Sequence, residues 1–420
     1  MRLLMFKNRV FPIIIVLVLV LISCAHKTKD ASALNEHQSE QTLDEVNSSS
    51  NTTIVVAANR TDAYIPKLKN RRVGVVANQT SVIYKANQKD YIHLVDSLLD
   101  RVVDIKKVYA PEHGFRGTAD AGEIIKDGID LKTNLPIISL YGDHKKPSLE
   151  QLSGLDIMIF DIQDVGARFY TYISTLHYVM EACAEAKLPL LILDRPNPNG
   201  HYVDGPILEL KHQSFVGMHP IPVVHGMTIG EYAKMINGEG WLNNKVQCDL
   251  EVITMNNYAH NKAYSLPIKP SPNLPNDQAI NLYPSLCFFE GTNVNAGRGT
   301  SKQFQIYGSP YLDKTVYNFK YIPTANEGSK YPKNQGMLCY GEDLSQQDTM
   351  SQIDLSFLIR AYQNTIDKDK FFNSFFVKLA GTESLKEQIV TGMSEAEIKK
   401  SWQSDLEQFK KTRERYLIYE

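Results

Sequence analysis

The segment 110–117, Ala-Pro-Glu-His-Gly-Phe-Arg-Gly, places a carboxylic acid, an imidazole and a guanidinium within one short stretch of chain. Pro111 and Gly114 favour a tight turn, so the backbone holds Glu112 in a defined direction. A carboxylic acid in a cleft beside an apolar ring such as Phe115 can act as a general acid. An ion pair between Glu112 and Arg116 explains the same spacing equally well.

Other charged and amide side chains follow three further apolar stretches of the chain. The group comprises Asn78, Gln79, Asp161, Asp164, Arg168, Tyr172, Asp194 and Arg195. Two carboxylates at one strand end, Asp161 and Asp164, can share a proton or position a water molecule. The alternative is that one of them binds Arg168 and caps the helix expected near Phe169. Asp194 and Arg195 can likewise pair with each other or with neighbouring loops.

His225 and a glycine-rich loop at 291–300 complete the candidates. His225 can carry a proton, although a single histidine is more often a hydrogen-bonded structural residue. The loop contains Asn295 and Arg298, and its arginine can bind a carboxylate or a phosphate. It has no Gly-Lys-Ser/Thr, and no Gly-x-Gly-x-x-Gly follows the first strand, which argues against NAD. Neither Gly-x-Ser-x-Gly nor His-Glu-x-x-His occurs.

Apolar strands that alternate with helical patterns position these residues. We expect strands at 73–77, 103–109, 136–140, 156–160, 188–193 and 250–255, and helices at 91–99, 149–152, 169–186 and 228–236. Continuous apolar strands between helices indicate an open, mostly parallel Rossmann-like α/β sheet with helices on both faces. Ligands bind beyond the carboxyl ends of such strands, so Glu112 and the polar strand ends should converge on one rim.

The remaining chain suggests four parts. We expect a signal peptide at 1–23, a lipidated Cys24 and polar tether at 24–53, the α/β domain at 54–260, and a smaller α+β domain at 261–420 with helices at 355–364, 370–380 and 395–416. A basic head, a short apolar run and Leu-Ile-Ser-Cys resemble a bacterial lipobox. This predicts a lipid anchor on the periplasmic side of the cell envelope. The outer membrane is favoured because Asp30 is too far from Cys24 for inner-membrane retention. The alternative is an uncleaved anchor helix.

Composition excludes some functions. The 420 residues include 45 basic and 47 acidic side chains, a net charge of −2, so nucleic-acid binding has no electrostatic support. Cys183, Cys248, Cys287 and Cys339 show no Cys-x-x-Cys or Cys/His spacing, which argues against zinc. Cys183 and Cys287 have apolar neighbours and are expected in the core. We predict no metal and no organic cofactor.

Eight ordered motifs resemble the NamZ-type exo-β-N-acetylmuramidase family, once a domain of unknown function. They lie at residues 74–80, 111–117, 161–172, 194–198, 225–228, 270–275, 290–293 and 297–300, and 401–402 and 416–419 also fit. The resemblance covers the chain from about residue 54 to its end. After Gly299-Thr300, relatives usually have Pro-Phe-Glu or a similar sequence, whereas this chain has Lys-Gln-Phe-Gln at 302–305. The lining of that edge of the site is therefore open.

The resemblance implies a Rossmann-like catalytic domain, a smaller C-terminal domain and a cleft between them. It also implies release of N-acetylmuramic acid from the non-reducing end of peptidoglycan fragments, with Glu112 as the catalytic acid. Glycosidases usually need a second carboxylate, here Asp161 or Asp164, unless the substrate's acetamido group replaces it. Arg168, Arg195 or Arg298 can bind the lactyl carboxylate of muramic acid. Predicted substrate-binding residues are Asn78, Gln79, His113, Arg116, Arg168, Tyr172, Arg195, His225, Asn295 and Arg298.

Two other functions fit the same residues. One is a non-catalytic cell-envelope lipoprotein that binds muropeptides or sugars in the same cleft. The other is a hydrolase acting on a different small anionic substrate. Turnover of an N-acetylmuramide separates these possibilities from the leading one.

Overall fold

The computed structural model describes residues 53–86, 90–117 and 127–420. The predicted signal peptide, Cys24 and nearly all of the predicted tether lie outside the described residues. Residues 53–420 belong to one compact unit. In this described part, no helix is long and apolar enough to cross a membrane.

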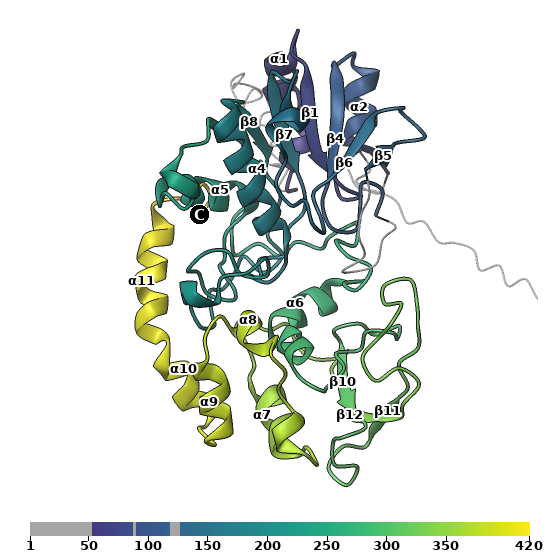
Figure 1. The fold of residues 1–420 in the computed structure, drawn as a ribbon, viewed down its shortest axis with the longest axis vertical. Coiled ribbons are helices and arrows are strands. Elements are labelled where there is room, and N and C mark those ends of the chain that lie inside the picture. The colour runs from purple at the N-terminus through teal and green to yellow at the C-terminus, as the bar shows by residue number, and fades with distance from the viewer. Residues whose placement is uncertain (1–52, 87–89, 118–126) are drawn as a thin grey trace, which may run out of the picture. The chain divides into compact units, whose positions relative to one another are not determined.

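Within the described residues, seven strands form the main sheet (Figure 1). In chain order they are β1 (Val73–Ala77), β4 (Ile105–Ala110), β5 (Gly128–Ile129), β6 (Pro136–Ser139), β7 (Ile157–Asp161), β8 (Leu190–Leu193) and β9 (Leu250–Ile253). Their order in the sheet is β5-β6-β4-β1-β7-β8-β9. Only the pairing of β5 with β6 is antiparallel. The expected mostly parallel sheet is thus confirmed.

Helices cover both faces of this sheet, as the alternation of strand side chains requires. The helices are α1 (Thr61–Leu68), α2 (Leu94–Asp100), α3 (Leu149–Leu152), α4 (Tyr172–Ala186) and α5 (Ile229–Gly238). On one face Val75 and Ile159 pack with residues of α1 and α2. On the other face Val76 and Phe160 pack with residues of α3, α4 and α5. The strands are therefore buried on both sides, which explains their uninterrupted apolar sequences.

The helix expected at 91–99 is wrong in its first turn. Tyr91–His93 forms a short strand, β3, which pairs antiparallel with β2 (Val82–Tyr84). The helix begins only at Leu94 because His93 caps it: the His93 Nδ1 accepts a hydrogen bond of 3.3 Å from the Val95 amide. Similarly, the long helix expected from residue 169 begins at Tyr172.

The C-terminal part contains helices and a small antiparallel sheet. The sheet has the order β10-β12-β11, and its strands are β10 (Ile306–Ser309), β11 (Phe319–Tyr321) and β12 (Cys339–Asp343). The helices are α6 (Asp277–Leu286), α7 (Ser356–Gln363), α8 (Phe376–Ala380), α9 (Ser384–Val390), α10 (Glu395–Ser401) and α11 (Gln403–Glu414). The helix expected at 370–380 is thus reduced to α8, and the one at 395–416 is interrupted at Trp402.

Short 3₁₀ turns join several elements. They are η1 (Ala57–Asn59), η2 (Leu210–His212), η3 (Asn243–Lys245), η4 (Cys287–Gly291) and η5 (Lys368–Lys370). One apolar cluster contains residues from both sides of position 260, for example Phe160 and Phe288. The two parts of the chain share this core, so the described residues do not separate into two cores at position 260. The predicted domain boundary near 260 stays a prediction.

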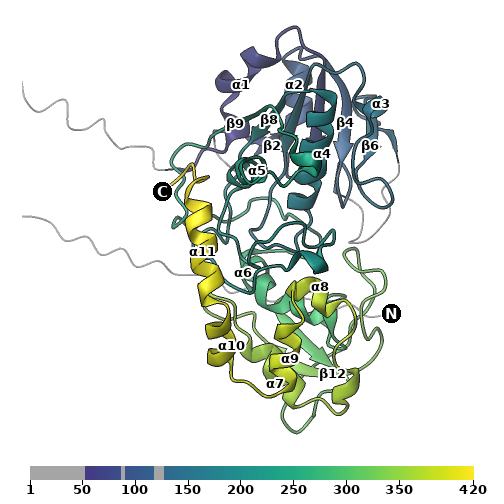
Figure 2. The same cartoon turned by 60° about the vertical axis from the view of Figure 1, so that its left-hand side comes forward.

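The C-terminal tail connects the two parts of the chain. Figures 1 and 2 show α11 running from α10 towards the sheet, so that the C-terminus lies beside α5. The backbone amides of Ile418 and Tyr419 donate to the buried Glu231 carboxylate at 2.9 and 3.2 Å. The Tyr419 hydroxyl donates to Asp194 at 2.8 Å. The end of the chain thus completes the hydrogen bonding of two buried acids.

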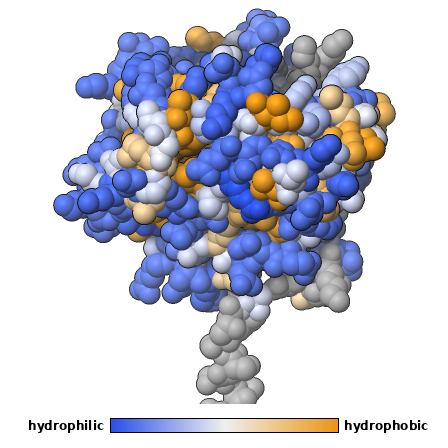
Figure 3. All heavy atoms as spheres, turned by 90° about the horizontal axis from the view of Figure 1, so that it is seen from below, coloured by the Kyte–Doolittle hydropathy of each residue, from blue (hydrophilic) through white to orange (hydrophobic). Residues whose placement is uncertain are grey.

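The surface and the cysteines are unremarkable for a folded protein of this composition. The face below the C-terminal elements is mainly hydrophilic, with apolar side chains in small separate groups (Figure 3). Cys183, Cys248, Cys287 and Cys339 are free and buried. The prediction that Cys183 and Cys287 lie in the core is confirmed.

Candidate active site

Glu112 lines a cavity of about 270 Å³. The cavity lies beyond the carboxyl end of β4, which ends at Ala110, and is closed by residues of the C-terminal part. His113, Tyr141 and Thr171 line it from the sheet domain, while Glu290 and Arg298 line it from the C-terminal part. The expectation that ligands bind beyond the carboxyl ends of parallel strands therefore predicted the location of this cavity.

A tight turn directs the Glu112 side chain into the cavity. The Gly114 amide donates to the Pro111 carbonyl at 3.0 Å. His113, between them, is buried and has a φ of 70°, a left-handed conformation that side chains other than glycine rarely adopt. Strained backbone of this kind is common at functional sites because surrounding contacts must hold it. His113 also lines the cavity, so its predicted place at the site agrees with the structure.

Two hydroxyl groups hold the Glu112 carboxylate. The Thr171 Oγ1 donates to the Glu112 Oε2 at 2.7 Å. The Tyr141 hydroxyl is also hydrogen-bonded to Glu112, and burial together with this carboxylate raises the pKa of Tyr141 above its usual value. Tyr141 therefore remains a protonated donor at neutral pH. Neither hydroxyl was predicted from the sequence.

Asn78 and Tyr172 support this arrangement from below and do not line the cavity. The Asn78 side-chain amide donates to the Tyr172 hydroxyl at 2.9 Å, and the Tyr172 hydroxyl lies 3.4 Å from the Glu112 carbonyl oxygen. Both side chains are buried. Their polar atoms bind other parts of the protein, and the prediction that they contact substrate stays a prediction. Gln79 similarly holds the backbone of the C-terminal part, donating to the Pro270 carbonyl at 3.0 Å.

Arg116 points away from Glu112. Its guanidinium binds Asp130 at 2.8 Å and Asp96 at 3.2 Å, and it lies 4.3 Å from the Phe115 ring centroid. The alternative of a Glu112–Arg116 ion pair is therefore wrong. Two carboxylates already hold the guanidinium, and the prediction that Arg116 binds substrate stays a prediction.

Asp161 and Arg195 form a buried ion pair below the site. Arg195 Nε and Nη2 bind the two Asp161 carboxylate oxygens at 2.6 and 2.8 Å. Arg195 Nη2 also donates to the Val82 carbonyl at 3.0 Å. Both side chains are almost completely buried. Neither group lines the cavity, so the catalytic role of Asp161 and the binding of the lactyl carboxylate by Arg195 have no support from this geometry and stay predictions.

Asp164 and His225 also lie in the interior. Asp164 Oδ2 accepts a hydrogen bond from the Gly166 amide at 2.7 Å and lies 3.7 Å from the His225 Nε2. His225 Nδ1 accepts from the Met227 amide at 3.2 Å. Both side chains are buried and neither lines the cavity. In this structure Asp164 holds the loop at 164–166 through the Gly166 amide, and the predicted catalytic role of Asp164 and substrate-binding role of His225 stay predictions.

Arg168 is a structural residue. Its side chain is fully buried and donates four hydrogen bonds of 2.7 to 2.9 Å to the carbonyls of Pro206, Ile221, Leu379 and Ala380. It therefore does not bind Asp164, and its predicted contact with a substrate carboxylate stays a prediction. Since Leu379 lines the cavity, Arg168 fixes one wall from behind.

Glu290 and Arg298 form a wall that the C-terminal part contributes. The Arg298 Nη1 lies 3.5 Å from the Glu290 Oε2. The Asn295 side-chain amide donates to the Arg298 carbonyl at 3.0 Å, so Asn295 shapes the loop, and its predicted contact with substrate stays a prediction. Lys333 Nζ donates to the carbonyls of Phe289 and Thr292 at 2.7 and 2.6 Å, and burial lowers the pKa of Lys333.

Glu290 is the functional candidate that the sequence analysis missed. It belongs to the motif at 290–293 that was used for the family resemblance, and it directly precedes the glycine-rich loop. Glu290 lies near the end of a 3₁₀ turn and does not follow a strand of the main sheet. The search for polar residues after the predicted strands therefore could not find it.

Aromatic rings complete the floor. Tyr283 meets Phe169 and Phe304 edge to face, at ring-centroid distances of 5.3 and 4.9 Å. Phe304 has a φ of 51°, which makes it a second left-handed residue in the lining. At the edge left open by the sequence, Phe304 lines the cavity, whereas the Gln305 side chain bonds to Asn276 at 3.2 Å.

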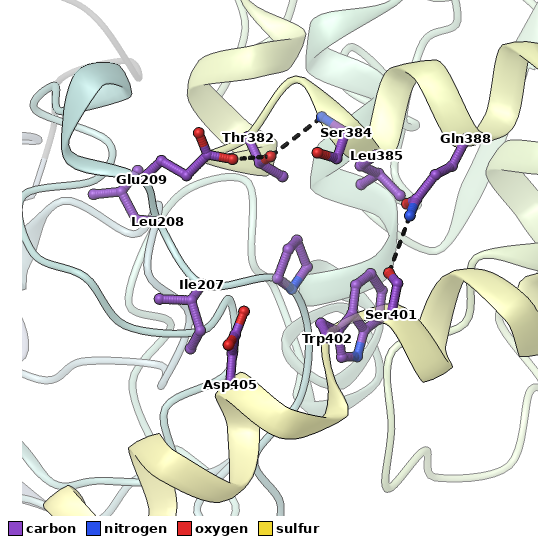
Figure 4. A pocket seen from close by; sticks show the side chains of 11 residues that line it. Ile207, Leu208, Glu209, Thr382, Ser384, Leu385, Gln388, Ser401, Trp402 and Asp405 are labelled. Atoms are coloured by element: carbon purple, nitrogen blue, oxygen red, sulfur yellow. Dashed lines mark hydrogen bonds between the residues drawn. The ribbon is translucent and has the colours of Figure 1, made fainter.

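A second cavity of about 290 Å³ lies between the segment 206–209 and the C-terminal helices. Figure 4 shows Glu209 joined to Thr382, and Gln388 joined to Ser401 at 3.0 Å, around this cavity. None of the predicted site residues lines it. The cavity at Glu112 is thus the candidate active site.

A mostly parallel α/β sheet with two carboxylates lining one cavity has the groups that a glycosidase needs. The sequence matches two family models: exo-β-N-acetylmuramidase NamZ, N-terminal, over residues 73–278, and exo-β-N-acetylmuramidase NamZ, C-terminal, over residues 281–419. The chain therefore belongs to the NamZ exo-β-N-acetylmuramidase family.

Known proteins agree with this assignment. The chain is 38% identical to the peptidoglycan β-N-acetylmuramidase NamZ of Bacillus subtilis over 85% of this chain and 89% of that protein. Its fold is similar to two crystal structures of DUF1343 family proteins from Bacteroides fragilis. One has a TM-score of 0.79 at 46% identity, with 88% of this chain and 99% of that chain covered. The other has a TM-score of 0.72 at 25% identity, with 87% and 99% covered.

Proposed function

We propose that this protein is an exo-acting glycoside hydrolase that releases terminal N-acetylmuramic acid from the non-reducing end of peptidoglycan fragments. The main support is that Glu112 and Glu290, from the two parts of the chain, line the same cavity. Family membership and the named activity of the Bacillus subtilis relative support the same reaction. No metal or organic cofactor is part of the proposal.

Glu112 is proposed as the general acid. In this role its carboxylic acid donates a proton to the glycosidic oxygen as the bond to the anomeric carbon breaks. The hydroxyls of Thr171 and Tyr141 fix the orientation of the carboxyl group. Because a hydroxyl can donate or accept, the Thr171 contact persists when Glu112 changes its protonation state.

Glu290 is proposed as the second carboxylate. It replaces Asp161 and Asp164, which the fold buries elsewhere. From its own wall it can activate water, attack the anomeric carbon, or orient the substrate's acetamido group. The Arg298 guanidinium beside it holds its side chain at this wall.

Arg298 is the one of the three predicted arginines that lines the cavity. A substrate carboxylate that enters between Glu112 and Glu290 needs a neighbouring cation, because like charges repel in a partly desolvated site. We therefore assign recognition of the lactyl carboxylate to Arg298.

Arg298→Gln should lower the preference for a chromogenic N-acetylmuramide over the matching N-acetylglucosaminide by about tenfold or more. Arg72→Gln, at an exposed ion pair, is the matched control. An unchanged preference in the Arg298 variant would contradict this assignment.

The cavity supports exo action. Its floor consists of buried side chains, including Tyr283, Cys287 and Phe304. A chain end can enter such a cavity, whereas the buried side chains among the described floor residues leave little room for a continuous glycan strand to pass. The terminal sugar therefore occupies the cavity and the rest of the fragment remains outside.

Turnover of a chromogenic β-N-acetylmuramide tests the function. The full-length protein in detergent should hydrolyse it, and Glu112→Gln should reduce kcat by about a thousandfold. Glu150→Gln, on the exposed surface of α3, controls for loss of a negative charge. Tight binding of muropeptides without any turnover would instead favour the sugar-binding lipoprotein.

We further propose that Cys24 carries a lipid anchor, which places the enzyme on the periplasmic side of the cell envelope, in the outer membrane. The supports are the basic head, the short apolar run and the Leu-Ile-Ser-Cys sequence. Metabolic labelling with a clickable fatty acid should label the wild type and leave Cys24→Ala unlabelled. Labelled protein in the inner-membrane fraction would refute the outer-membrane assignment.

A further inference from the structure

The lining of the Glu112 cavity divides into a buried floor and an exposed mouth. Floor residues such as Phe169 and Leu274 are only 3% and 1% exposed. Tyr141, Phe215 and Val216 are half-buried, and Phe375 is 37% exposed. Aromatic rings therefore stand where the cavity opens to solvent, on the path from the bond that breaks to the outside.

A tight turn presents Phe215 at this mouth. The Ser214 amide and the Gly217 carbonyl bond to each other at 2.9 Å, as do the Gly217 amide and the Ser214 carbonyl. Phe215 and Val216 are thus the two central residues of a closed turn. The Ser174 hydroxyl on α4 donates to the Phe215 carbonyl at 2.7 Å, which attaches the turn to the sheet domain. This anchoring means that little conformational entropy is lost when a ligand contacts the ring.

The Phe215 ring continues an aromatic surface that leaves the cavity. Its centroid lies 6.0 Å from that of Tyr141 and 6.3 Å from that of Tyr178, to which it is nearly parallel at 21°. Tyr178 is half-buried on α4 and does not line the cavity. We call Tyr141, Phe215 and Tyr178 the aromatic ledge. The Lys145 Nζ lies over one face of the Phe215 ring, 5.3 Å from its centroid.

A pyranose ring suits this surface. One face of a β-linked hexosamine presents mainly C–H groups, which lose contact with water when they lie on an aromatic ring. Its hydroxyl and acetamido groups remain at the edge of the ring, where the Lys145 ammonium can donate hydrogen bonds to them. The ledge begins at Tyr141, which is itself bonded to Glu112, so a sugar on the ledge is adjacent to the proposed proton donor.

We propose that the aromatic ledge binds the leaving group, an uncharged N-acetylhexosamine unit linked to the terminal muramic acid. This inference rests on the proposed function and adds a second sugar-binding position to it. Contact between the leaving sugar and the ledge orients the glycosidic oxygen towards Glu112. The ledge therefore raises the rate with disaccharides more than the rate with substrates that have a small leaving group.

Two substrates of different leaving-group size test the ledge. The measured quantity is the ratio of kcat/KM for the disaccharide N-acetylmuramyl-β-1,4-N-acetylglucosamine to kcat/KM for methyl β-N-acetylmuramide, with the full-length protein. Phe215→Ala should lower this ratio about tenfold. Tyr178→Ala, farther along the ledge, should lower it about threefold. Tyr311→Ala removes an exposed ring that does not line the cavity and should leave the ratio unchanged.

The outcomes separate the ledge from the chemistry. An unchanged ratio in both Phe215→Ala and Tyr178→Ala, with both substrates still hydrolysed, would overturn the ledge and leave the proposed function intact. Tyr178→Ala also protects the test against misfolding of the turn variant, because it leaves the turn at 214–217 unaltered. If the wild type hydrolyses neither substrate, the proposed function fails and the ledge falls with it.

Discussion

Glu112 and Asp161 are both acids at the carboxyl edge of the same sheet, yet their surroundings are opposite. Asp161 ends β7 and is held by the Arg195 guanidinium at 2.6 and 2.8 Å without exposure to solvent. Glu112 follows β4, contacts hydroxyl groups and faces an open cavity. An acid fixed by a buried cation away from any cavity supports the fold, whereas an acid that lines a cavity can exchange a proton with a ligand. The four predictions below test this division between scaffold and site.

The largest effect is expected at Glu112. Glu112→Gln should lower kcat about a thousandfold, about 4 kcal/mol, because the amide cannot donate the proton. The free energy of unfolding should change by less than about 1 kcal/mol, since the amide still accepts from Thr171. Steady-state kinetics and urea unfolding measure the two quantities. A large loss of stability with near-normal kcat would reverse the assigned role of Glu112.

Asp161 should show the opposite pattern. Asp161→Asn leaves the buried Arg195 without its counter-charge and should destabilise the protein by about 3 kcal/mol. Asp156, at the other end of the same strand, pairs with Arg72 on the surface at 2.8 Å. Asp156→Asn is therefore a matched control that should cost less than about 1 kcal/mol. Equal losses in the two variants, measured by urea unfolding, would contradict the comparison.

Asp194, at the end of β8, is another buried acid of the scaffold. Its protonation should make the free energy of unfolding depend on pH. Burial, followed by the nearby Glu231 charge, raises the pKa of Asp194 to about 7. The folded state therefore binds this proton more tightly than the unfolded state, and the stabilisation is complete below about pH 4 and lost as the pH rises to 7. Because of Asp194, the free energy of unfolding should fall by about 2 kcal/mol as the pH rises from 5 to 7. Asp194→Asn should flatten that part of the pH–stability curve, and a slope equal to that of the wild type would disprove the interpretation.

The smallest effect is expected at Thr171. Thr171→Val retains the shape but removes the hydroxyl that donates to Glu112, so kcat should fall about tenfold, about 1.4 kcal/mol. Thr175→Val, one turn later on α4, removes a buried hydroxyl that bonds only to the Thr171 carbonyl among its described partners, at 3.4 Å. That control should stay within about twofold of wild type. If both variants behave alike, the Thr171 hydroxyl has no specific part in the site.

The sequence predicted the sheet well because parallel strands buried on both faces have uninterrupted apolar sequences. It also located Glu112 and Arg298 correctly at the cavity. It failed to distinguish Glu112 from Asp161, because both follow strands and only tertiary packing decides which side chain meets Arg195. Thr171 and Tyr141 were missed because a hydroxyl carries no sequence signal until its partner is known. Glu290 was missed because the chain reaches the cavity there from the C-terminal part, outside the α/β pattern.

The hydrogen bonds from Ile418 and Tyr419 to Glu231 and Asp194 also make the folding of the sheet domain depend on a distant part of the chain. Both acids belong to the sheet domain, but the donors at Ile418 and Tyr419 lie 187 to 225 residues farther along the chain. A chain interrupted shortly before its end leaves these acids without those donors, which is costly in the interior. The stability of the sheet domain therefore depends on contacts made by residues far along the chain from it.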